Sequence, residues 1–173
     1  MRVLYILENP GFDPGHRDKL LTQLRSLLPV INVRVGTRHI EVDVITENIA
    51  EASEKLEKAV GGKVVEVVDI SFENVGGGLE AYVQLFNKER FWEAHMALEE
   101  EWRRSRDSTL QGLIMLAAAF VKIQEGRVDK FETLLKEALN LLKDDVGCLK
   151  IEAVRKAAEK ALITREFFRL ECL

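Results

Sequence analysis

Three consecutive glycines, Gly76–Gly78, separate two parts of the chain in which apolar residues repeat with different periods. Before them, short alternating runs are separated by helix-like segments. After them, apolar residues follow helical spacing alone. Alternation indicates strands, and spacing of three and four residues indicates amphipathic helices. Because consecutive glycines interrupt both patterns, we expect two domains, 1–70 and 79–173, joined by a glycine-rich linker at 71–78.

The first part is predicted to form an α/β domain. Residues 2–7 are a continuous apolar run, typical of a strand buried on both faces. Residues 39–45 alternate strictly, with Ile40, Val42 and Val44 on one face. The predicted elements are strands 2–7, 31–35, 39–45 and 63–70, and helices 16–28 and 47–60. Their βαββαβ order is that of ferredoxin-like domains.

The second part shows helical periodicity throughout. Helices are predicted near 79–87, 89–104, 109–125, 128–143 and 147–161, with a last one near 163–171. Short polar turns join them, as in a bundle of antiparallel neighbours. The fold class is therefore α+β, a ferredoxin-like sandwich followed by an all-α helical bundle.

The charge balance argues against nucleic acid as a partner. The net charge is −4, and residues 1–70 carry 9 basic and 11 acidic side chains against 16 and 18 in the rest of the chain. Neither part has the excess positive charge that phosphate binding needs. The longest apolar run, 113–121, is too short to span a bilayer, so no membrane partner is expected.

The N-terminus lacks the pattern of a signal peptide, and a cytoplasmic location is expected. Cys148 and Cys172 are the only cysteines. Two reduced core thiols are the favoured interpretation. Many Lys, Glu and Arg with few Asn and Gln hint at a thermophile, in which an intracellular disulfide is the alternative.

Residues 89–104 carry the candidate site. On a helical wheel, Phe91, His95, Leu98 and Trp102 share one stripe, with Glu99 beside it. His95 is expected to be buried there, one turn from Glu99. Glu93 falls on the opposite side and cannot join them. The following acidic and basic runs, 99–101 and 103–106, are expected to form solvated ion pairs.

Two interpretations of His95 and Glu99 compete. In the first, a buried imidazole is hydrogen-bonded to a carboxylate and stabilises the bundle. In the second, the two residues ligate a divalent metal such as zinc or manganese from one helix face. A metal needs at least one more ligand, which cannot be assigned from the sequence. Spacing alone favours the structural interpretation.

Gln111 has a structural explanation of its own. The run Ser108–Gln111 fits a capping box, with Ser108 as N-cap and Gln111 returning to its backbone N–H.

Two segments together resemble a known family. They are "FNKERFWEAHMALEEEWR" (86–103) and "LQGLIMLAAAFVKIQEGRVDKFETLLKEALNLL" (110–142). They are similar to the domain of unknown function 309 family over about residues 80–143. The matching residues are Phe86, Asn87, Phe91, Glu93, His95, Glu99, Trp102, Leu110, Gln111, Gly112, Leu113, Ile114 and Gly126.

The resemblance implies a compact helical bundle around one central helix and no established activity. Members have been suggested to be metal-dependent hydrolases because of the His/Glu motif. This chain departs from the motif at Met96, where an acidic residue is usual, and at Met115, where a glutamine is usual. Both departures remove polar groups near the site.

Two functions follow as hypotheses. The first is a binding or interaction protein with a His95–Glu99 pair, whose small-molecule ligand is unknown. The second is a metal-dependent hydrolase that uses His95 and Glu99 as ligands. A homodimer is also expected, because strand 2–7 is apolar on both faces and its two helices cover only one.

Overall fold

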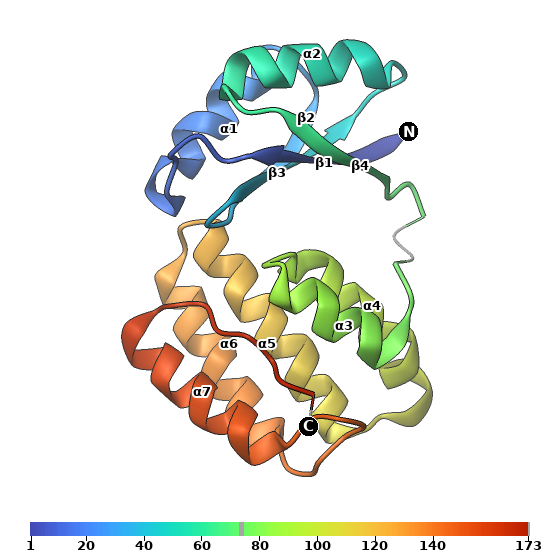
Figure 1. The fold of residues 1–173 in the computed structure, drawn as a ribbon, viewed down its shortest axis with the longest axis vertical. Coiled ribbons are helices and arrows are strands. Elements are labelled where there is room, and N and C mark those ends of the chain that lie inside the picture. Colours follow the sequence, from blue (N-terminus) through green and yellow to red (C-terminus); the bar gives the residue numbers. More distant parts are fainter. Residues whose placement is uncertain (73–74, 173) are drawn as a thin grey trace. The chain divides into compact units, whose positions relative to one another are not determined.

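The computed structural model describes residues 1–72 and 75–172, which form two compact units (Figure 1). Among these residues, the first unit contains 1–72 with Gln124–Gly126, and the second contains the remainder. Within the predicted linker 71–78, residues 73 and 74 lie outside the described part of the chain. In the part that is described, no helix is long and apolar enough to cross a membrane.

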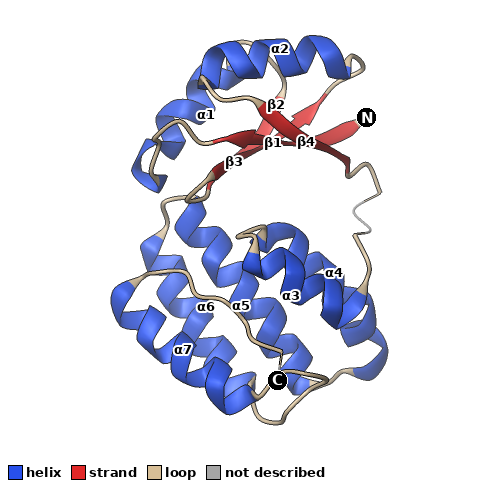
Figure 2. Cartoon of the chain, viewed as in Figure 1, coloured by secondary structure: helices blue, strands red, loops and turns tan. Residues whose placement is uncertain are grey.

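The first unit is built on a four-stranded antiparallel sheet (Figure 2). Its strands are β1 (Arg2–Glu8), β2 (Val30–Val35), β3 (His39–Ile45) and β4 (Val64–Asp69), in the order β2-β3-β1-β4. The connections contain the 3-10 turn η1 (Pro14–His16) and helices α1 (Arg17–Arg25) and α2 (Ile49–Val60). A sheet followed by helices confirms the α+β fold class.

One face of this sheet packs against α1 and α2. The alternate residues Val3, Tyr5 and Leu7 of β1 enter a core with the leucines of α1 and with Leu56 of α2. Helix α2 starts where the Asn48 side chain accepts the Glu51 N–H at 3.1 Å. It ends at Gly61, whose φ of +83° is easily reached only without a Cβ.

The second unit contains five helices among the described residues. They are α3 (Gly78–Asn87), α4 (Phe91–Ser105), α5 (Ser108–Gln124), α6 (Val128–Leu141) and α7 (Ile151–Thr164). Helix α5 is central, because its Phe120 contacts aromatic rings from α3, α4, α6 and the segment after α7. A small-residue stretch allows this close approach, and Ala117 and Ala119 are fully buried.

The predicted last helix near 163–171 is wrong. Helix α7 continues to Thr164 and ends at Arg165, which adopts a left-handed conformation with φ of 58°. Residues 165–172 are not helical. The Asn87 side chain bonds both the N–H and the carbonyl of Leu170, at 2.7 and 3.0 Å. Because Asn87 supplies these bonds, the segment stays extended across the bundle.

The prediction of two reduced thiols is also corrected. Cys148 and Cys172 form a disulfide with a Cα–Cα distance of 4.7 Å, within the usual range for such a bond. The cause is a backbone bridge between Leu149 and Cys172, which brings the neighbouring Cys148 within reach. The disulfide closes the connection from the α6–α7 turn to the extended C-terminal segment.

Candidate functional site

The candidate site on α4 is a row of three polar side chains, one helical turn apart. His95 Nε2 lies 3.7 Å from Glu99 Oε1, and Arg103 Nη2 donates to Glu99 Oε2 at 2.6 Å. The His95–Glu99 separation is that of an ion pair and exceeds a hydrogen bond, so the predicted hydrogen bond is absent from this pair of atoms. Glu99 is therefore shared between a histidine and an arginine.

The row lies at the edge of the bundle core. The His95 side chain retains 19% exposure and that of Glu99 26%. The ring of Trp92 meets the His95 imidazole edge-on, with centroids 6.0 Å apart. Trp102 is half-buried, and Arg106 lies over its ring at 4.9 Å. His95 is thus largely but not fully enclosed.

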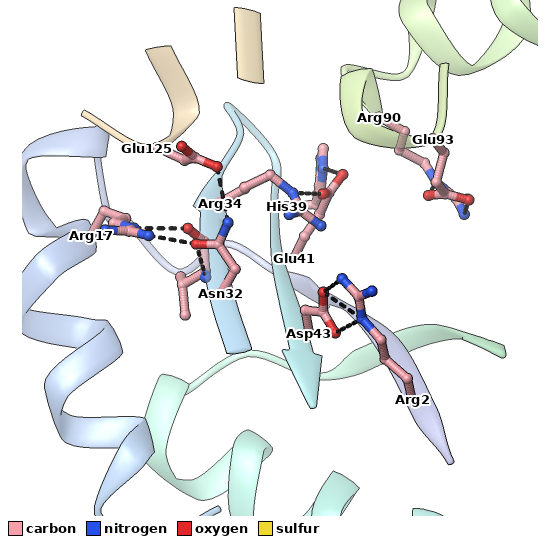
Figure 3. Close-up of polar contacts among 11 residues, drawn as sticks. Arg2, Arg17, Asn32, Arg34, His39, Glu41, Asp43, Arg90, Glu93 and Glu125 are labelled. Carbon is pink, nitrogen blue, oxygen red and sulfur yellow. Dashed lines mark hydrogen bonds and ion pairs between the residues drawn. The ribbon is translucent and has the colours of Figure 1, made fainter. Parts of the chain in front are cut away.

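Glu93 lies away from His95 and Glu99, as the wheel predicted. Its side chain is buried, with 3% exposure. Arg90, at the N-cap of α4, donates to both of its carboxylate oxygens at 2.6 and 2.7 Å (Figure 3). The bidentate geometry is the strongest form of such a pair, and it fixes the entry of the chain into α4.

The capping-box prediction for Gln111 is wrong. The N-cap of α5 is Asp107, whose carboxylate accepts the Leu110 N–H at 2.9 Å. Ser108 is the first helical residue, and its hydroxyl donates to the carbonyl of Leu141 at 2.9 Å. Gln111 is half-buried within the first turn. An aspartate is as good an N-cap as a serine, and the one-residue shift removes Gln111 from the N3 position.

Reasoning from the sequence missed a second polar cluster, on the sheet face opposite α1 and α2. Arg34 on β2 donates to Glu41 on β3 at 2.5 Å, and His39 Nε2 lies 3.3 Å from the other Glu41 oxygen (Figure 3). Arg2 binds Asp43 through three contacts of 2.6–3.2 Å. The clue was available, because β3 alternates Ile40, Val42 and Val44 with three charged or titratable residues.

Electrostatics explain why Glu41 is ionised. Glu41 is completely enclosed, and burial opposes its ionisation. The Arg34 charge, with the His39 contact, outweighs burial and holds the pKa of Glu41 below its ordinary value. A paired carboxylate of this kind acts as a structural anion, since it does not take up a proton near neutral pH.

The residues of α4 do not fit a metal centre. Among the described residues, no group of three His, Cys, Asp or Glu side chains is placed to hold a metal ion. A catalytic zinc site needs about three protein ligands, whereas α4 offers His95 and Glu99. Glu99 already binds Arg103 at 2.6 Å, and Glu93 is held by Arg90.

Comparison with known protein families finds a similarity for part of the helical unit. A family model described as "Domain of unknown function (DUF309)" matches residues 79–134, which span α3, α4, α5 and the first part of α6. Neither the curated proteins nor the solved structures gave a match. His95, Glu99 and the buried Glu93 all lie within the matched segment. Residues 79–134 are therefore similar to the DUF309 family, as the sequence resemblance indicated.

Proposed function

We propose that this protein is a binding or interaction protein, in which His95 and Glu99 form a half-enclosed polar pair that stabilises α4 and contacts ligand. One observation carries the proposal: the carboxylate of Glu99 is bound by Arg103 at 2.6 Å, on the oxygen that does not face His95. An arginine beside a carboxylate reduces the negative charge available to a cation.

Metal-dependent hydrolysis has weaker support from the same residues. A cation between His95 and Glu99 would have two protein ligands and an adjacent guanidinium. The positive charge of Arg103 would oppose it, because like charges a few ångströms apart repel strongly at a partly enclosed site. The remaining acidic motif residue, Glu93, is occupied by Arg90.

Melting temperatures with and without metal test the proposal. Zinc and manganese are each added to untagged wild-type protein, to His95→Ala and to Glu100→Gln. Glu100 is a matched control, because it forms an exposed pair with Arg104 on the same helix, at 3.4 Å. We expect no metal-dependent rise in any of the three. A rise in the wild type and in Glu100→Gln, lost in His95→Ala, would show a metal site and refute the proposal.

We also propose that the first unit is a ferredoxin-like domain, separate from the helical domain 79–173. The order β1-α1-β2-β3-α2-β4 and the strand order β2-β3-β1-β4 support this. Residues 79–173 expressed alone should give a helical circular dichroism spectrum with a cooperative thermal transition. An unfolded spectrum would argue against separate domains. In the full chain, nuclear Overhauser contacts from Tyr5 to both Val42 and Val67 would test the strand order. The cytosolic location stays a prediction from the sequence.

A further inference from the structure

We propose that the outer edge of β4 is an interaction surface that pairs with β4 of a second copy of this chain. Among the strands of the described residues, β4 lies at the edge of the sheet and pairs with β1 alone. Its side chains are unusually exposed for a valine-rich strand: Val65 is 59% and Val67 is 39% accessible. Phe72, just beyond the strand, is 92% accessible. A valine-rich edge with open backbone groups is a template for pairing.

The hydrogen-bond phase shows which backbone groups are open. The Ile70 N–H donates to the carbonyl of Arg2, so residues 66, 68 and 70 face β1 in the antiparallel ladder. The intervening residues, Val67 and Asp69, therefore direct their backbone N–H and C=O groups away from β1. The pairing of β1 with β3 on its other side agrees with this alternation. There the Thr46 N–H donates to the carbonyl of Met1 at 3.0 Å, so the odd-numbered residues of β1 face β3.

The other edge of the sheet is covered by side chains. Arg25 donates to the carbonyls of Val30 and Ile31 at 3.0 and 2.9 Å. Arg17 donates to the carbonyl of Val33 at 3.1 Å. Three outward acceptors of β2 are thus satisfied by two arginines of α1. On β4, Glu57 of α2 accepts the Val64 N–H at 2.9 Å, which closes only the beginning of the strand.

The distribution of apolar side chains favours a second copy as the occupant. Val65 lies at one end of the open edge, where a bulge shifts the register opposite Ile6 and Leu7, and Phe72 lies beyond the other end. An antiparallel twofold pair brings Phe72 of each copy beside Val65 of the other. This contact between two exposed apolar side chains therefore forms twice, once at each end of the interface. A twofold pair also closes both edges and leaves none for further growth.

Charge selects the register. If Val67 pairs with Asp69 of the second copy, the outward N–H and C=O groups of both residues form four hydrogen bonds across the interface. Val68 then lies opposite Val68 of the second copy. Glu66 then faces Ile70 of the second copy. In the register that places Glu66 opposite its counterpart, two like charges would be in direct contact, which is unfavourable. The Val67–Asp69 register avoids this.

Sedimentation equilibrium of the full chain, over a wide concentration range, tests the interface. We expect a reversible dimer in the wild type. Val67→Pro removes an outward N–H without affecting the ladder to β1, a position where edge strands tolerate proline. It should weaken the dimer by about 10- to 100-fold, because two symmetry-related hydrogen bonds are lost. Val65→Lys should do so as well, because it replaces the apolar contact with Phe72 of the second copy by a charge that must be desolvated.

Ile31→Lys is the matched control, because Ile31 is 37% exposed on the covered edge of the sheet. This substitution should leave the dimer unchanged. Circular dichroism checks that each variant is folded. If Val67→Pro does not fold, Val65→Lys and Phe72→Ser decide, since both residues are exposed. A wild type that is monomeric at every concentration overturns the proposal. So does a dimer that survives Val65→Lys and Phe72→Ser, or one that Ile31→Lys weakens equally.

Discussion

Replacing Phe120 by alanine should be among the most destabilising single changes in the helical unit. Phe120 is fully buried on α5. Its ring lies 5.1–5.8 Å, centroid to centroid, from those of Phe86, Phe91, Phe131, Phe167 and Phe168. Truncating a buried phenylalanine costs about 3–5 kcal/mol, and aromatic pairs add to the burial term. We expect a loss near 5 kcal/mol in the free energy of unfolding, measured by urea denaturation.

Two companion variants separate the packing contribution from hydrophobicity alone. Phe120→Leu keeps most of the apolar volume and loses the ring contacts, so it should cost about 1–2 kcal/mol. It also remains measurable if the alanine variant does not fold. Ile163→Ala, at a residue of α7 that is 84% exposed, should change stability by less than about 0.5 kcal/mol. A cost for Phe120→Ala below about 2 kcal/mol would refute the idea that this ring is the centre of the core.

Three further changes test the polar network and the disulfide. Glu93→Gln should lower the free energy of unfolding by about 3–5 kcal/mol, because it leaves a buried arginine without its counter-charge. The exposed control Glu100→Gln should lower it by less than about 0.5 kcal/mol. Urea denaturation compares the two variants. Replacing Cys148 and Cys172 by serine should lower stability by about 3 kcal/mol for a loop of 24 residues, and equal melting temperatures would contradict this. Since the pKa of Glu41 is lowered on folding, its stabilisation is present above the ordinary glutamate pKa, about 4.3, and is lost as the pH falls below that. Glu41→Gln should reduce the fall of the melting temperature at acid pH. An unchanged fall would show that other groups cause it.

The regular elements could be predicted wherever one face of the element is uniformly apolar. β3 was placed at 39–45 from alternation alone, and α2 followed from its apolar stripe and the glycines after it. The segment 163–171 has helical spacing, yet residues 165–171 are not helical, because Phe167 and Phe168 contact Phe120 and Asn87 binds Leu170. Those long-range contacts have no local signature, so spacing alone could not exclude a helix there.

The candidate site was predicted in part for a similar reason. A helical wheel brings His95 and Glu99 together and predicts the Glu99–Arg103 pair, because all three residues lie on one helix. The wheel places Glu93 away from His95, but the burial of the Arg90–Glu93 pair was not predicted, although Arg90 lies three residues before Glu93 in the predicted helix 89–104. The cluster around Glu41 joins neighbouring strands, and its partners become visible only when the register of β2 on β3 is known.

The register of Arg34 opposite Glu41 has a consequence for how this sheet can change by mutation. The two residues are direct cross-strand partners and both are buried. Losing either one alone leaves an enclosed charge, whereas replacing both by apolar residues of similar size can be nearly neutral. The pair should therefore show strong epistasis: each single step is selected against, and the double change is accessible mainly when both substitutions occur together or when a third residue first supplies a compensating charge.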